Sequence, residues 1–234
     1  MGNESIAILL YPGFTALDVV GPQYMFASMM GAKVHLVAKT MEPVASDTGF
    51  SIMPTATFND MPEKLTVLMI PGSGKGVLQT MQDSETMDFV HQQGLNAEYV
   101  TSVCTGSLIL GAAGLLEGYR ATSHWIGLES LEQFGATPVN QRVVEDRNRI
   151  TAAGVSAGLD FGLTMVAKFR GDLYAQSTQL LAEYAPEPPF NAGSKETAPA
   201  KVRRYIEGLF AGYSEKVIQA GQAAYQSYIT PKDP

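Results

Sequence analysis

Short apolar runs recur through the first half of the chain, and each is nearly continuous rather than alternating. They are rich in β-branched residues, which is typical of strands buried on both faces of a parallel sheet. The sequence therefore predicts strands over 5–10, 33–38, 66–70 and 99–103.

The segments between these runs have helical character. The segment 18–30 carries Pro22 near its first turn, where proline is tolerated, and 83–95 opens on acidic residues that suit a helix dipole. Later in the chain, a hairpin turning at Arg147-Asn148 is predicted over 142–154, and helices over 125–135, 156–169 and 172–184. This alternation predicts an α/β fold with a doubly wound, mostly parallel sheet flanked by helices.

The C-terminal part follows another pattern. Four prolines in 185–200 predict an extended loop, and the Ala- and Gln-containing segment 201–229 predicts a helical tail. We therefore expect a single α/β domain over 1–200 and a helical tail over 201–234 packed on it.

Charge and composition exclude several classes of function. The net charge is -7 and no strongly basic stretch offsets it, which argues against a nucleic-acid partner. No apolar run approaches the ~20 residues of a membrane span, and the N-terminus lacks a basic signal region. We expect no membrane partner and a cytoplasmic location. One cysteine and three separated histidines indicate no disulfide and no metal site.

The one cysteine, Cys104, lies where a predicted strand meets a helix. Ligands bind beyond the carboxyl ends of parallel strands, and a helix N-terminus lowers the pKa of a thiol. The run Ser102-Val103-Cys104-Thr105-Gly106 resembles a nucleophile elbow, with Ser102 in place of its first glycine. We expect a partly exposed thiol with a depressed pKa. The alternative is a small buried hydrophobe.

Two further groups follow predicted strands. The run PGSGKG (71–76) lacks the spacing of a phosphate loop, so we reject nucleotide binding there. The backbone N–H groups of Gly72 and Ser73 are candidate donors to an anionic intermediate, the alternative being a plain turn. Asp18 is either a helix N-cap or a carboxyl group that moves a proton near Cys104.

His124 is the histidine that could approach this edge of the sheet. No histidine follows it in the sequence, which excludes a catalytic triad with a late histidine.

With these motifs the sequence resembles the ThiJ/PfpI superfamily, which has a flavodoxin-like or class I glutamine amidotransferase-like fold. Within it, the isocyanide-hydrating members are the most similar. The matching motifs are LDVVGP (17–22), IPGSG (70–74), YVTSVCTGSLILGAAGLLEG (99–118), ATSHW (121–125), AGVSAGLDF (153–161) and LLAEYAPEPPFNAGSKETAP (180–199).

The resemblance implies a role for each matching residue. Cys104 matches the nucleophile, Asp18 the acidic residue beside it, and Thr105 a threonine that helps to orient the aspartate. Pro71-Gly72-Ser73 stands where the family usually has Pro-Gly-Gly. The residues implied around a possible pocket are His124, Ala153, Gly154 and Val155. Members are commonly dimeric, so we expect a homodimer.

The implied reaction is hydration of an isocyanide to an N-substituted formamide through a thioimidate on Cys104, with no metal or organic cofactor. One alternative is a ligand-sensing domain related to AraC-type regulators, although residues 201–234 are too few for two helix-turn-helix units. Others are a redox or stress-response protein, or glyoxalase-type or hydrolytic chemistry with His124 as base. Aspartate rather than glutamate at position 18 favours the hydratase.

Overall fold

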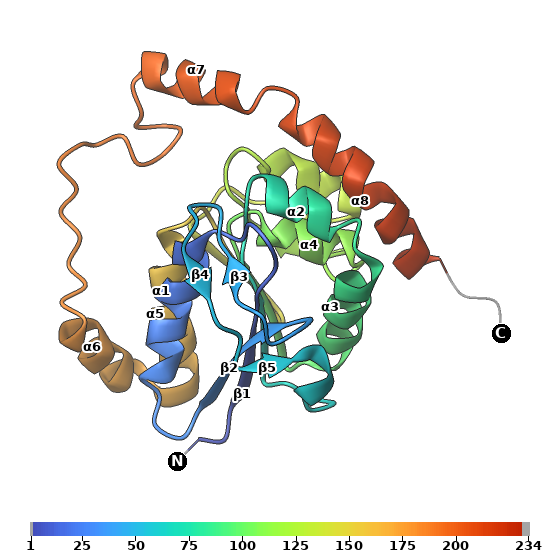
Figure 1. Cartoon of the computed structure of the whole chain (residues 1–234). Helices are drawn as coiled ribbons and strands as arrows, with labels where there is room; N and C mark the ends of the chain where they lie inside the picture. The colour runs from blue at the N-terminus through green and yellow to red at the C-terminus, as the bar shows by residue number, and fades with distance from the viewer. Residues whose placement is uncertain (1, 231–234) are drawn as a thin grey trace.

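A seven-stranded sheet forms the centre of the molecule in the computed structural model, which describes residues 2–230 (Figure 1). The strand order is β10-β11-β7-β6-β1-β2-β5, and every neighbouring pair is parallel except β10 with β11. The strands are β1 (Ser5–Leu9), β2 (Lys33–Ala38), β5 (Ala56–Thr57), β6 (Val67–Ile70), β7 (Tyr99–Val103), β10 (Val143–Asp146) and β11 (Arg149–Ala152).

The four strands predicted from continuous apolar runs are confirmed as β1, β2, β6 and β7. Every residue of β6 is buried, as expected where helices cover both faces of a sheet. Ile6 pairs with Val67, and Val67 with Tyr99, so three strands end side by side. Their carboxyl ends bring the segments after Leu9, Ile70 and Val103 to one edge of the sheet.

Helices cover both faces of this sheet, as the doubly wound prediction requires (Figure 1). One layer contains α1 packed against α5, where the Phe26 and Phe161 rings meet edge to face at 5.8 Å. The other layer includes α4, which packs against α8. The helices are α1 (Ala16–Ala27), α2 (Lys75–Thr80), α3 (Ser84–Asn96), α4 (Gly106–Ala112), α5 (Ala157–Arg170), α6 (Asp172–Leu181), α7 (Ala200–Leu209) and α8 (Tyr213–Ile229).

The segment predicted as a helix over 125–135 is instead a 3₁₀ helix, η2 (Leu128–Phe134), which ends at Gly135 as expected. A second 3₁₀ helix, η1 (Phe58–Asp60), was not predicted. Two small two-stranded sheets were also missed, because strands of two residues show no periodic pattern. They are β3 (Val44–Ala45) with β4 (Ser51–Ile52), and β8 (Arg120–Ala121) with β9 (Thr137–Pro138).

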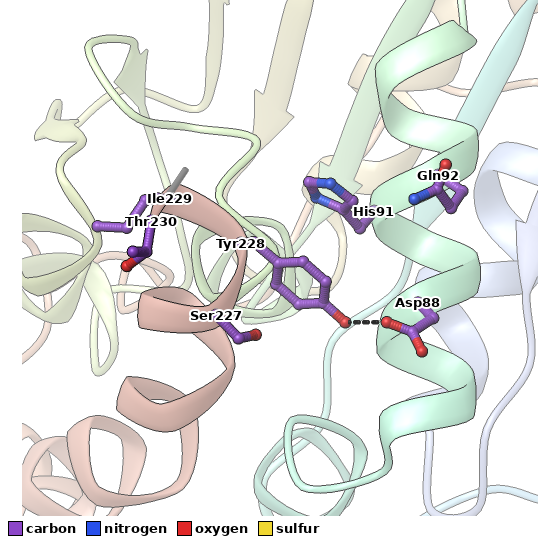
Figure 2. Close-up of a pocket in the computed structure, with 7 residues that line it drawn as sticks. All are labelled: Asp88, His91, Gln92, Ser227, Tyr228, Ile229 and Thr230. Atoms are coloured by element: carbon purple, nitrogen blue, oxygen red, sulfur yellow. Dashed lines mark hydrogen bonds between the residues drawn. The ribbon is translucent and has the colours of Figure 1, made fainter. Parts of the chain in front are cut away.

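The helical tail consists of two helices that behave differently. No residue of α7 is buried, and Figure 1 shows α7 and the loop before it standing away from the sheet. In contrast, α8 packs on α4 and η2. Its last turn is fastened to α3, where the Tyr228 hydroxyl donates to Asp88 at 2.7 Å and the Tyr228 ring stacks on His91 (Figure 2).

We find no helix between residues 2 and 230 with the length and apolar character that a membrane crossing requires.

Candidate active site

Cys104 lies on a sharp turn between β7 and α4, and its φ of 58° is in the left-handed region. This turn can pack against the end of β6 because Gly106 has no side chain. A methyl group at Gly106 would lie 2.2 Å from the Ile70 carbonyl oxygen. The predicted strand–turn–helix elbow is therefore present, and Gly106 is the small residue that it needs.

Substitution of Gly106 by alanine should destabilise the fold by about 3 kcal/mol, because the clash is with backbone rather than a flexible side chain. Urea unfolding measures this loss. Gly74→Ala is the matched control, since nothing lies within 4 Å of the added methyl group. Equal free energies of unfolding for the two variants would contradict the close packing at Gly106.

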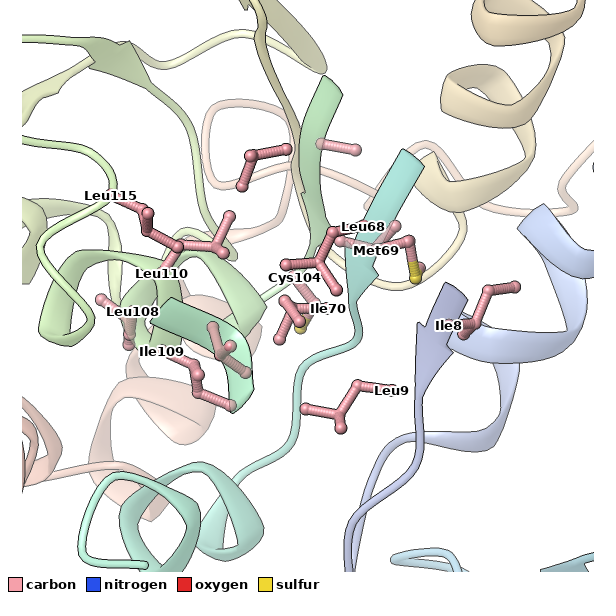
Figure 3. Close-up of a cluster of buried hydrophobic side chains, with 14 of the residues drawn as sticks. Ile8, Leu9, Leu68, Met69, Ile70, Cys104, Leu108, Ile109, Leu110 and Leu115 are labelled. Atoms are coloured by element: carbon pink, nitrogen blue, oxygen red, sulfur yellow. The ribbon is translucent and has the colours of Figure 1, made fainter. Parts of the chain in front are cut away.

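The prediction of a partly exposed thiol with a depressed pKa is wrong. Cys104 is only 5 % exposed and packs among side chains that include Ile70 and Leu108 (Figure 3). Burial, followed by the negative charge of Asp18, raises the pKa of the Cys104 thiol well above its usual range. The dipole of α4, a helix of only seven residues, does not offset this desolvation.

Several groups nevertheless favour the charged form of the sulfur. The backbone N–H groups of Thr105 and Val155 and the Thr105 hydroxyl act on the Cys104 sulfur and lower the pKa of its thiol. Val155 has a φ of 36°, which is strained for a β-branched residue. The backbone N–H of Cys104 donates to the carbonyls of Ala152 and Ala153 at 3.0 Å. The segment 153–155 therefore lies against Cys104.

Asp18 is fully buried in the first turn of α1, two residues beyond the helix start, so Thr15 rather than Asp18 is the N-cap. The backbone N–H of Gly72 donates to Asp18 Oδ2 at 2.8 Å, while Oδ1 has no partner within the described residues. The Cys104 side chain and the Gly72 N–H both favour the charged form of this carboxyl group and so lower its pKa. Burial raises its pKa to about 7. Asp18 and Cys104 are thus two buried groups, each of which shifts the pKa of the other.

This raised pKa links stability to pH. Burial favours the protonated form of Asp18 in the folded state. The contribution of Asp18 to the free energy of unfolding is therefore greatest below the unfolded pKa of about 3.9, and it is lost as the pH rises through about 7. Relative to Asp18→Asn, the wild type should lose about 4 kcal/mol of unfolding free energy over this interval. Urea unfolding of both proteins at several pH values measures the difference. Parallel pH profiles would show that the carboxyl group ionises normally.

The predicted backbone donors, Gly72 and Ser73, are buried but not free for an intermediate. The Gly72 N–H is bonded to Asp18, and the Ser73 N–H donates to Thr105 Oγ1 at 2.9 Å. The Thr105 hydroxyl in turn donates to the Ser73 carbonyl at 2.7 Å. The implied contact of Thr105 with the aspartate is therefore indirect, through the loop 71–73 that holds Asp18.

Two tyrosines that sequence reasoning missed also hold this loop. The Tyr11 hydroxyl donates to the Pro71 carbonyl at 2.8 Å, and the Tyr213 hydroxyl donates to the Ser73 carbonyl at 3.3 Å. Tyr11 lies two residues beyond the end of β1, so its position near a strand end was an available signal. Tyr213 opens α8 far along the chain, and no pattern in the sequence relates it to the elbow.

His124 lies beside the segment 153–155, although no hydrogen bond within residues 2–230 joins its ring to Cys104 or Asp18. The ring packs on Gly154, where a methyl group would lie 2.4 Å from His124 Cδ2. The backbone N–H of Ile126 donates to Nδ1 at 3.3 Å, and burial lowers the pKa of His124. Its contacts indicate a neutral, packed ring. No group of three or more His, Cys, Asp and Glu side chains in residues 2–230 is arranged to hold a metal ion.

A flavodoxin-like sheet with a cysteine on its nucleophile elbow and a carboxyl group beside that thiol defines a class of α/β proteins. Within that class the chain belongs to the DJ-1/PfpI family, whose pattern matches residues 4–168.

Comparison with known proteins gives three informative relatives. The chain is 50 % identical over 197 residues to an isonitrile hydratase of Pseudomonas putida, covering 84 % of this chain and 86 % of that one. It is 29 % identical to a helix-turn-helix-type transcriptional regulator of Pseudomonas aeruginosa, over 72 % of this chain and 47 % of the regulator. A crystal structure of a ThiJ/PfpI family protein from Pseudomonas syringae superposes with a TM-score of 0.93 and 56 % identity, covering 94 % and 91 % of the two chains.

Proposed function

We propose that this protein hydrates isocyanides to N-substituted formamides. The observation that carries the proposal is the burial of Cys104 and Asp18 beside each other, where a carboxyl group with a pKa of about 7 influences the one thiol of the chain. The similarity to an isonitrile hydratase over most of both chains supports it. Such a pair supplies both the nucleophile and the proton shuttle that this reaction needs.

In the first half of the reaction the sulfur of Cys104 attacks the terminal carbon of R–N≡C. Asp18, as the carboxylate, takes the thiol proton and delivers it to that carbon. The product is the thioimidate R–N=CH–S on Cys104. The N–H groups of Thr105 and Val155 stabilise negative charge on the sulfur while the proton is away.

In the second half, water adds to the thioimidate carbon, and Asp18 accepts one proton from the water and passes it to the nitrogen. As the C–S bond of the tetrahedral adduct breaks, Asp18 transfers the hydroxyl proton to the leaving sulfur, which gives R–NH–CHO and restores the Cys104 thiol and the Asp18 carboxylate. The protonated and deprotonated forms of a carboxyl group with a pKa near neutrality have similar free energies, so Asp18 can act as base and acid in turn.

A substrate screen tests this proposal against its alternatives. The protein is incubated separately with an aryl isocyanide, methylglyoxal and a short amide, and products are followed by absorbance and mass spectrometry. Formamide from the isocyanide supports the hydratase, and turnover of methylglyoxal instead supports glyoxalase-type chemistry. No turnover of any of the three would overturn the hydratase proposal and favour a ligand-sensing domain, which the similarity to part of a transcriptional regulator makes the second candidate.

We further propose a homodimer, with the isocyanide as small-molecule partner and the cytoplasm as the location, where reducing conditions keep the free Cys104 thiol reduced. Exposed apolar residues on α1 and α7 support a second copy as a partner, because no part of the chain between residues 2 and 230 covers either face. These residues are Leu17, Val20, Tyr24, Val202, Tyr205 and Leu209.

Light scattering at micromolar concentration should therefore give twice the 25.1 kDa of one chain. Replacement of Val202 and Leu209 by serine should weaken the dimer, whereas the same change at Leu95, exposed on α3, serves as the control. A monomeric wild type would contradict the proposal.

A further inference from the structure

The loop 71–73 depends on a residue from outside the family domain. Tyr213 is the first residue of α8, well beyond the matched residues 4–168, yet its side chain is only 7 % exposed and reaches the elbow. Its hydroxyl donates to the Ser73 carbonyl at 3.3 Å, the same carbonyl that accepts from the Thr105 hydroxyl. The tail helix is therefore linked through Ser73 to the residue next to the nucleophile.

The Ser73 carbonyl accepts hydrogen bonds from two hydroxyl groups, at 2.7 Å from Thr105 and at 3.3 Å from Tyr213. A carbonyl oxygen has two lone pairs and accommodates both, but the Thr105 hydroxyl has one hydrogen. While that hydrogen is donated to Ser73, it cannot also be donated to the Cys104 sulfur. Donation of this hydrogen to the sulfur therefore competes with its observed donation to the carbonyl.

We propose that Tyr213 is a positioning residue for the reaction proposed above: its hydroxyl satisfies the Ser73 carbonyl, which frees the Thr105 hydroxyl to donate to the Cys104 sulfur when the thiol proton moves to Asp18. Without Tyr213, that rotation would leave a buried carbonyl unpaired, which is costly. Thr105 keeps its second contact, because its oxygen still accepts from the Ser73 N–H at 2.9 Å.

The attachment of α8 suits this role. Val217 and Tyr225 are buried on the same helix, and Tyr228 fastens its far end to Asp88 and His91 (Figure 2). Burial raises the pKa of Tyr213, so the phenol remains a hydrogen-bond donor throughout the neutral range. A helix held at both ends keeps this donor aimed at the loop.

The test is Tyr213→Phe, which removes the hydroxyl and keeps the ring. Tyr225→Phe is the matched control, since Tyr225 lies on the same helix, is equally exposed at 7 %, and donates no hydrogen bond within the described residues. We measure alkylation of Cys104 by iodoacetamide against pH with mass spectrometry, which is unambiguous because the chain has one cysteine. We also measure kcat and KM with an aryl isocyanide.

We expect alkylation of Tyr213→Phe to be about tenfold slower at each pH, with kcat about tenfold lower and KM little changed. Tyr225→Phe should match the wild type. The direction of the change separates positioning from loosened packing, because a loosened site would expose Cys104 and make alkylation faster. Unchanged or faster alkylation in Tyr213→Phe would overturn the proposal.

The pair Thr105→Val and Thr105→Ser provides a second test that does not depend on how well Tyr213→Phe folds. Thr105→Val should slow alkylation and Thr105→Ser should not, and adding Tyr213→Phe to Thr105→Val should have no further effect, since both act through one hydroxyl. Equal rates for the two Thr105 variants, or additive effects, would overturn the proposal. Alkylation needs no isocyanide, so these outcomes are distinct from a failure of the proposed function.

Discussion

Replacement of Cys104 by alanine should reduce formamide formation to the uncatalysed background, because no other thiol in the chain can form the adduct with the isocyanide carbon. The measurement is the absorbance change of an aryl isocyanide at saturating concentration. The fold should remain intact, since alanine fits the space of a buried, small side chain.

Ser102→Ala is the control for this experiment. Ser102 is buried on β7, the strand that leads into the turn at Cys104, and its hydroxyl has no partner within the described residues, so its loss should leave turnover near the wild-type value. Wild-type turnover by Cys104→Ala would show that the reaction does not pass through a covalent adduct.

Replacement of Asp18 by asparagine should lower kcat by ~10²-fold or more, which is the scale of one lost general acid–base group. Asparagine has nearly the same shape, and its oxygen can still accept the Gly72 N–H. The reactivity of the thiol should change in the opposite direction. Asp18 raises the pKa of Cys104 through its charge, so Asp18→Asn should be alkylated by iodoacetamide faster than the wild type.

The pH profile gives an independent check on Asp18. The carboxylate is the form that accepts the thiol proton, so kcat/KM should rise as pH increases through about 7. Asp18→Asn should lack this rise. Near-normal turnover in Asp18→Asn would show that another group moves the proton.

Much of the fold follows from local patterns in the sequence. The continuous apolar runs at β1, β2, β6 and β7 predict a parallel sheet, because strands covered on both faces need no polar side. Sheet geometry then predicts that residues after β1, β6 and β7 meet at one edge. That reasoning, without any coordinates, brings Asp18, Gly72 and Cys104 together.

The pattern could not predict how the helical tail divides. Over 201–229 the composition favours helix throughout, yet the chain breaks between α7 and α8 at residues 210–212. One helix is buried against α4 and the other is exposed, a difference that depends on the shape of the surface they meet rather than on their own propensities.

The sequence by itself determined the fold class, the elbow and the identity of the thiol and carboxyl group, because these depend on short-range periodicity and on the edge where parallel strands end. Only the tertiary structure decided that Cys104 is buried, that Gly72 and Ser73 use their N–H groups to hold Asp18 and Thr105, and that Tyr213 reaches them from the tail. The physical reason is that desolvation and hydrogen-bond partners are set by every element packed around a group. The pKa of Cys104 is therefore raised rather than lowered, because distant segments exclude water from the thiol, and no local sequence pattern records that exclusion.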